Sequence, residues 1–222
     1  MKQLETFVLK SSNLILLALL FVLLLFAPSS PASTSQKEWR FRVFLDDKEI
    51  GTHDFFLSDQ QNSKLLRSEA RFIYKLMFIK LYEYEHQNTE IWQGDCLSQI
   101  ESETDANGKP YEVIGAKDKT GFRVSGSEGE ALLPSCVMTF AYWNPDFLQQ
   151  TRLLNTQNGE YVEIEVTPPK SVELEVRGNR QAALQYELKA GELELNLWYS
   201  LDNEWLALES QTNGRSLRYV LL

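Results

Sequence analysis

Apolar and polar residues alternate along most of this chain after residue 37. In one clear stretch, Val172, Leu174 and Val176 alternate with Glu173 and Glu175. Successive side chains of a strand point to opposite faces of a sheet, so this period of two predicts strands with one buried and one wet face. Parallel strands are usually buried on both faces and would read as continuous apolar runs. The pattern therefore predicts a mostly β, antiparallel fold.

Turn residues separate the alternating stretches. Asn107-Gly108 lies between residues 96–104 and 111–117 and is a strong signal for a tight hairpin. Counting such stretches gives about twelve strands. A sheet of that size curls, splits into layers or closes. We therefore predict a strongly curved antiparallel sheet, or incomplete β-barrel, of about twelve strands with one or two short helices. Helical turns are expected at Asn144–Gln150, where Asn144 suits a cap and Pro145 the first turn, and within Met77–Leu81.

The N-terminus has the order of a secretory signal. Lys2 and Lys10 precede the apolar run Leu14–Ala27, which is shorter than the about 20 residues of a membrane span. We predict a signal peptide over residues 1–32, cleaved after Ala32, and a single β-rich domain over residues 33–222. The protein is then periplasmic or secreted. The alternative is an uncleaved run 14–27 that anchors it to the inner membrane.

Charge and cysteine content limit the function classes. The formal net charge of −9 disfavours nucleic acid as a partner, because an acidic chain repels phosphate backbones. The sequence holds no glycine-rich phosphate loop, so we expect no cofactor. Cys96 and Cys136 are the two cysteines. An oxidising compartment permits a disulfide between them, and two separate buried thiols are the alternative.

The chain contains no recognisable catalytic or metal-binding motif. Its two histidines, His53 and His86, are not in a pair with metal-ligand spacing. Ser127 follows glycine in a Ser-Gly-Ser-Glu-Gly stretch that lacks the full nucleophile-elbow pattern. We select no catalytic residue and expect no metal; the sequence leaves enzyme activity open and favours its absence. A hydrolase using His53 or His86 is the less favoured reading.

Aromatic residues are the best binding candidates. The side chains that we select as the lining of a groove for an apolar ligand are Tyr82, Tyr84, Trp92, Trp143 and Trp198. Trp198 stands on the polar side of its strand, which is unusual for a core residue. The alternative for all five is ordinary packing in the core or at its rim.

An ordered set of short motifs resembles an uncharacterised family of exported bacterial proteins. The motifs, running over nearly the whole predicted mature chain, are Trp39-x-Phe-x-Val-x-Leu-Asp46, Ile50-Gly-Thr-His-Asp-Phe55, Tyr82-x-Tyr-x-His86, Glu90-x-Trp92, Thr104-Asp-x-Asn-Gly108, Trp143-Asn-Pro145, Leu153-Leu-Asn-Thr-Gln-x-Gly159 and Leu197-Trp-Tyr199. The pattern is more distantly similar to the half-barrel proteins that carry lipoproteins across the periplasm. That resemblance implies a long curved sheet around a hydrophobic groove, and by fold analogy alone it suggests lipid binding.

These observations lead to three functional expectations. The first is a non-enzymatic periplasmic module that holds a lipid, an acylated protein or another apolar ligand. The second is a structural or adaptor protein of the cell envelope, with a solid core and a protein partner. The third is the hydrolase already mentioned.

Overall fold

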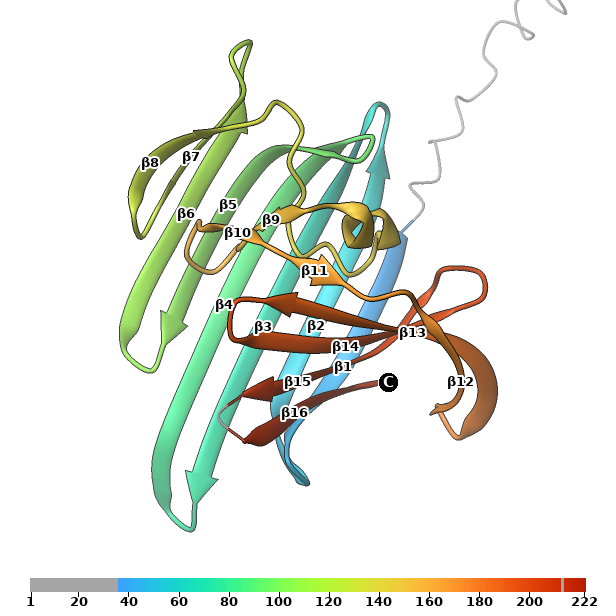
Figure 1. The fold of residues 1–222 in the computed structure, drawn as a ribbon. Helices are drawn as coiled ribbons and strands as arrows, with labels where there is room; N and C mark the ends of the chain where they lie inside the picture. The colour runs from blue at the N-terminus through green and yellow to red at the C-terminus, as the bar shows by residue number, and fades with distance from the viewer. Residues whose placement is uncertain (1–35, 213) are drawn as a thin grey trace, which may run out of the picture. The chain divides into compact units, whose positions relative to one another are not determined.

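The computed structural model describes residues 36–212 and 214–222, which form sixteen strands and one short 3-10 helix (Figure 1). The strands are β1 (Gln36–Leu45), β2 (Lys48–Gln60), β3 (Ser63–Leu76), β4 (Ile79–Gln93), β5 (Cys96–Ala106), β6 (Lys109–Lys117), β7 (Phe122–Gly126), β8 (Gly129–Leu133), β9 (Arg152–Leu154), β10 (Tyr161–Glu163), β11 (Glu165–Val166), β12 (Lys170–Val176), β13 (Asn179–Ala190), β14 (Leu193–Ser200), β15 (Trp205–Thr212) and β16 (Arg215–Leu221). The helix is η1 (Pro145–Gln149).

Fourteen of the strands form one antiparallel sheet. Its main path runs β11-β13-β14-β15-β16-β1-β2-β3-β4-β5-β6-β7-β8, and β12 pairs with β13. The two halves of the chain join where the last strand pairs with the first, with Phe41 opposite Leu221. Among the described strands, β8 and β11 end the path and do not pair with each other, so the sheet is not closed. Strands β9 and β10 form a separate two-stranded sheet.

Alternating burial explains why these segments form strands. In β1, Trp39, Phe41 and Val43 are buried while the residues between them are exposed. Strand β14 repeats the pattern with Leu195, Leu197 and Tyr199, although the residues between these are half-buried. The predicted mostly β, antiparallel class is thus confirmed. The strand count exceeds the expected twelve, because short strands such as β11 offer too few residues to show a period.

The two predicted helical turns have different outcomes. At the first, the Asn144 side chain accepts a hydrogen bond from the backbone N–H of Asp146 and caps η1, so a short helix is present, although of the 3-10 type. The helical turn expected within Met77–Leu81 is wrong. Leu76 pairs directly with Ile79 across a tight β-turn, because the long β3–β4 ladder continues to its tip.

The inner face of the sheet, defined here as the face that carries its buried residues, is covered by two parts of the chain. Strands β13–β16 cross in front of β1–β4 (Figure 1). Trp205 of β15 packs on Phe41 and Phe55, with ring centroids 4.4 and 5.0 Å apart. The second part, residues 134–166, we call the cover segment; it buries Phe147 and Leu153 among other side chains. The main core lies between these layers.

A disulfide joins the cover segment to the sheet. Cys96 at the start of β5 is bonded to Cys136. Next to it, the Leu97 N–H donates to the Val137 carbonyl across 2.9 Å. The predicted leader, with its cleavage after Ala32 and the anchoring alternative, lies outside the described residues. Within the described part of the chain, no helix is long and apolar enough to span a membrane.

Candidate functional site

The inner face of β4 carries polar side chains where a core strand would carry apolar ones. Its inward positions include His86, Asn88 and Glu90, which are only 5%, 6% and 1% exposed. Buried polar groups cost free energy unless they find partners. At these three positions of β4, hydrophobic packing does not explain why the residues are polar.

Strand pairing places these β4 residues in rows that run across the neighbouring strands. His53 of β2 is opposite Ala70 of β3, which is opposite His86, and Thr104 of β5 follows. The next row contains Phe55, Ser68, Asn88 and Ser102 in the same order. Because Ser68 and Ala70 are small, they leave space between the larger side chains of β2 and β4.

The space is a cavity of about 230 Å³ between the inner face and its covering layers. We call it the inner cavity. Its walls are His53, Phe55, Leu66, Ser68, Tyr84, His86, Asn88, Glu90, Phe140, Tyr142, Trp143, Asn155, Thr156, Gln157, Leu193 and Tyr219. The walls thus come from β2, β3 and β4, from the cover segment, and from β14 and β16. Larger depressions elsewhere include one of about 520 Å³ and one of about 890 Å³, and about half of the residues that line each of these two carry a charge.

Direct hydrogen bonds fix many of the polar wall groups. His53 Nδ1 lies 3.2 Å from Tyr219 Oη, and His86 Nδ1 lies 2.8 Å from Thr104 Oγ1. The Tyr84 hydroxyl donates to Gln157 Oε1 across 3.2 Å. The bonds of His53 and Tyr84 link β2 to β16 and β4 to the cover segment, while the bond of His86 joins β4 to β5. They hold the cavity walls in a defined arrangement.

Glu90 provides the one carboxyl group among the residues that line the inner cavity, and it is only 1% exposed. Asn88 Nδ2 donates to its Oε1 across 2.9 Å, and Trp92 Nε1 donates to its Oε2 across 2.7 Å. Burial raises the pKa of Glu90, and the hydrogen bonds from Asn88, Trp92 and Thr139 oppose that shift. The carboxyl group therefore takes up the amide N–H of Asn88, and the Asn88 amide oxygen has no hydrogen-bond partner among the described residues.

Three residues of the cavity wall each carry a buried side-chain atom with no hydrogen-bond partner within the described part of the chain. These atoms are His53 Nε2, Asn88 Oδ1 and Trp143 Nε1. Trp143 also lines a neighbouring depression of about 250 Å³. Buried polar groups in proteins are nearly always paired, so unpaired atoms on residues that line one cavity indicate a place for a bound molecule or water.

The electrostatics of the cavity favour a neutral occupant. Burial lowers the pKa of His86 to about 4, and burial together with the nearby His86 lowers the pKa of His53 well below its usual value. Both imidazoles are therefore uncharged near neutral pH. Burial also raises the pKa of Tyr84, so this phenol stays protonated. No fixed positive charge among the lining residues would balance an anionic ligand.

The structure brings together two of the five aromatic candidates. Tyr84 and Trp143 line the inner cavity. Trp92 is fully buried beside it, edge-on to Trp143 and bonded to Glu90. Tyr82 is 40% exposed near the β3–β4 turn, and Trp198 is half-buried at a position that alternates with the buried Leu197 and Tyr199.

Sequence reasoning missed Ser68, Asn88, Glu90 and Gln157. For Asn88 and Glu90 the usable signal was the polar alternation His86-x-Asn88-x-Glu90, which stands between the aromatic positions Tyr84 and Trp92 of the same strand face. No group of three or more His, Cys, Asp or Glu side chains that could hold a metal occurs within residues 36–212 and 214–222.

Comparisons with known proteins place the chain in a family. Residues 41–222 match the family described as domain of unknown function DUF6134, and the chain belongs to this family. The predicted resemblance to an uncharacterised family is confirmed at that level. No curated protein matches the sequence.

A solved structure supports the fold. The chain is similar to the "beta-barrel-like protein of domain of unknown function DUF1849" from Brucella abortus, with a TM-score of 0.60 and 9% sequence identity. The similarity covers 85% of this chain and 96% of that one. At 9% sequence identity the comparison supports the β-barrel-like fold and says nothing about function.

Proposed function

We propose that this protein is an exported, non-enzymatic binding module that holds a small neutral molecule in the inner cavity. The observation that carries the proposal is a pair of unpartnered buried atoms, His53 Nε2 and Asn88 Oδ1, on two residues that line one cavity. Export depends on the predicted signal peptide. In this view the open sheet works as an incomplete, strongly curved barrel that surrounds the ligand.

The wall chemistry supports a particular class of ligand. Asn88 Oδ1 needs a donor, and the neutral His53 ring offers one further donor or acceptor position. Around them, Phe55, Leu66 and Phe140 supply apolar surface. A hydroxyl or amide group on a compact apolar body meets both requirements.

The small volume of the inner cavity disfavours a lipid, which the sequence had suggested as a ligand. Ligand pockets usually measure about 300–1,000 Å³, and the inner cavity is smaller. A whole acyl chain would need the cover segment to move away. We therefore favour a compact ligand over a lipid or an acylated protein.

A hydrolase has weaker support in the geometry. His86 contacts Thr104 Oγ1, but an imidazole whose burial lowers its pKa to about 4 is a weak base near neutral pH. His53 contacts Tyr219 and lies 6.4 Å from the His86 ring, between centroids. Among the described residues, no carboxylate orients either histidine toward a nucleophile, as a triad requires.

The test is mass spectrometry of protein purified gently from an exporting host. We expect the native mass to exceed the denatured mass by that of a small molecule, which solvent extraction releases. Ser68→Phe, which fills the cavity, and Asn88→Leu, which removes the acceptor, should both lose this mass. Glu69→Phe, on the opposite face of the same strand, should keep it.

The solid-core adaptor is the second candidate, favoured by the small cavity. Equal native and denatured masses for the wild type, together with unchanged behaviour of Ser68→Phe, would support it. The same result would overturn the binding proposal.

A further inference from the structure

The β3–β4 hairpin extends beyond the strands on both sides of it. Pairing between β2 and β3 ends at Gly51 and Phe72, and pairing between β4 and β5 begins at Tyr84 and Ala106. Residues 73–83 therefore continue as a ribbon of two strands only. Figure 1 shows its turn projecting past the neighbouring turns at that end of the sheet.

The end of this ribbon is apolar and exposed on all sides. Leu76, Met77, Phe78 and Ile79 are consecutive, and their exposed fractions are 56%, 85%, 101% and 66%. We call these four residues the tip. Folding gives no reason for four exposed apolar residues in a row, and such patches on soluble proteins usually mark an interaction site.

The turn of this hairpin also shows that folding does not explain the apolar residues of the tip. Met77 adopts a φ of 52°, in the left-handed region that glycine and asparagine tolerate best. The hairpins β5–β6 and β12–β13 use Asn107-Gly108 and Arg177-Gly178 at their turns. The tip instead places two large apolar side chains at its turn.

A ring of cationic and aromatic side chains lies directly behind the tip. Lys75 and Lys80 pair with each other across the ribbon, and Tyr74 and Tyr82 form the next pair back. Lys48 donates a hydrogen bond to the Lys75 carbonyl, and its ammonium group lies 4.9 Å from the Tyr74 ring centroid.

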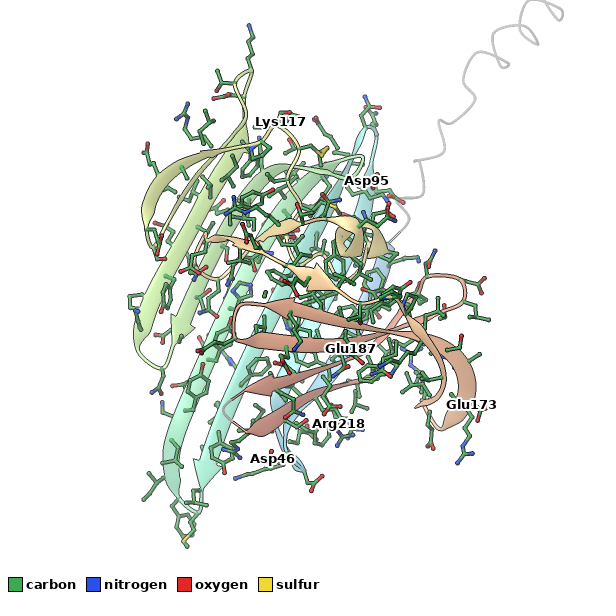
Figure 2. The ribbon with its side chains drawn as sticks, in the orientation of Figure 1. Asp46, Asp95, Lys117, Glu173, Glu187 and Arg218 are labelled. Atoms are coloured by element: carbon green, nitrogen blue, oxygen red, sulfur yellow. A yellow bond between two sulfur atoms is a disulfide. The ribbon has the colours of Figure 1, made fainter. Side chains whose placement is uncertain are left out.

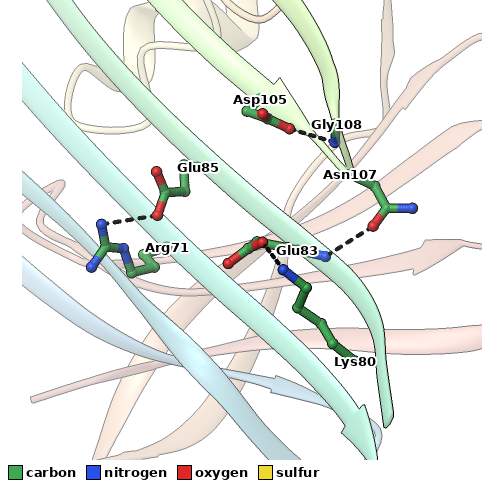
Figure 3. Close-up of polar contacts among 7 residues, drawn as sticks. All are labelled: Arg71, Lys80, Glu83, Glu85, Asp105, Asn107 and Gly108. Carbon is green, nitrogen blue, oxygen red and sulfur yellow. Dashed lines mark hydrogen bonds and ion pairs between the residues drawn. The ribbon is translucent and has the colours of Figure 1, made fainter.

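Two acidic residues near the ring form ion pairs and partly neutralise its positive charge. Lys80 forms an ion pair with Glu83, whose backbone N–H is bonded to Asn107 (Figure 3). Asp46, which lies toward the same end of the molecule (Figure 2), pairs with Arg215. Lys75 takes part in none of the ion pairs formed between described residues.

We propose that the tip inserts into the surface of an anionic lipid bilayer. The order along the ribbon matches the layers of a bilayer surface: apolar residues at the tip, then lysines, then tyrosines. Lysine reaches to the headgroup level while its stem stays in apolar surroundings, and tyrosine prefers the same interface. Near an anionic surface each lysine adds attraction, which a chain of net charge −9 otherwise lacks.

The shape of the tip favours a bilayer over a protein partner. A stable protein interface buries about 1,200–2,000 Å² between two fitted surfaces. A two-stranded ribbon with apolar side chains all around it offers no such surface. A fluid medium covers all its sides at once. Insertion of about 5–10 Å, typical for interfacial segments, would take in the tip.

The experiment uses the protein as expressed, with its N-terminus determined by mass, and variants with the same N-terminus. The probe is vesicles of phosphatidylethanolamine and phosphatidylglycerol in equal amounts, with a nitroxide-labelled lipid as quencher. We expect the added indole emission of Phe78→Trp to be quenched on vesicle binding. The matched control, Leu201→Trp in the exposed β14–β15 turn, should be unaffected.

Partitioning gives the second readout. We expect Phe78→Ser to reduce the vesicle partition coefficient by about tenfold. Lys75→Gln combined with Lys80→Gln should reduce the preference for these vesicles over phosphatidylcholine by about tenfold as well. Leu201→Ser should leave both values unchanged. An unquenched Phe78→Trp on bound vesicles, or a dimer in lipid-free buffer that Phe78→Ser dissociates, would overturn the proposal.

Discussion

Trp92 donates its indole N–H to the carboxyl group of Glu90 across 2.7 Å, and both side chains are almost completely buried on the inner face of β4. The two residues stand two positions apart, so the strand itself holds them on one face. Asn88 adds a second donor to the same carboxyl group. Asn88 and Glu90 thus place a hydrogen-bonded polar pair in the wall of the inner cavity.

Replacing Glu90 should be costly only when its hydrogen bonds are lost. Glu90→Leu leaves the donors of Asn88 and Trp92 buried without an acceptor, and we expect a loss of about 3 kcal/mol of unfolding free energy. Glu90→Gln keeps an acceptor and should lose less than half as much. Urea unfolding at neutral pH measures both. Glu101→Leu, at an exposed position on the neighbouring strand, is the control and should be nearly neutral.

Removal of the Glu90 charge should also change the response to pH. Because burial raises its folded-state pKa, the folded state holds this proton more tightly than the unfolded state. Its contribution to stability is full below the unfolded pKa of about 4.5 and is lost as pH rises through the folded value. Glu90→Gln should abolish this component. An identical pH slope in the wild type and the variant would contradict the assignment.

The two histidines act in the opposite direction. Burial lowers the pKa of His86 from 6.5 to about 4, so the unfolded state binds the proton more readily. The stability from the neutral ring is full above pH 6.5 and is lost as pH falls toward 4. We expect the wild type to lose about 3 kcal/mol more than His86→Gln between these pH values. Denaturant titrations at both pH values measure the difference, and parallel curves would contradict it.

The Cys96–Cys136 disulfide should stabilise the cover segment. The cysteines are 40 residues apart in sequence, and closing such a loop contributes about 4 kcal/mol on the chain-entropy model. A reductant should therefore lower the unfolding midpoint of the wild type. The double variant Cys96→Ser, Cys136→Ser should start at that lower midpoint and show no response to reductant. A wild type that is insensitive to a reductant proven to cleave the bond would refute this prediction.

The sequence predicted the strands better than the site, for a physical reason. Alternation is a property of neighbours in the chain, so Trp39, Phe41 and Val43 already indicate a half-buried strand. The pairing of β16 with β1, and the crossing of β13–β16 over β1–β4, depend on contacts between distant residues. The inner cavity forms only when both this pairing and this crossing are in place.

The site residues show the same limit. Tyr84 and Trp143 were selected as bulky aromatics, and they do meet at the inner cavity. Ser68 matters because it is small and stands between Phe55 and Asn88, a fact of register that the sequence does not state. The cover-segment residues of the cavity wall, within 140–143 and 155–157, lie in irregular backbone, where no strand alternation marks them.

The cover segment should be sensitive to a single methyl group at Gly126. A Cβ atom there would lie 2.4 Å from the Asn158 carbonyl oxygen and 2.8 Å from Gly159 Cα, both backbone atoms that cannot rotate away. The adjacent Ser127 N–H donates to the same carbonyl, so the contact fixes the turn that carries Thr156 and Gln157 to the cavity. We expect Gly126→Ala to destabilise the fold by about 2 kcal/mol. Amide exchange at residues 155–159 should quicken more than in β1. Ser125→Ala, whose side chain is exposed, should change neither. Unchanged exchange at these amides in Gly126→Ala would show that the cover segment is held in place by other contacts.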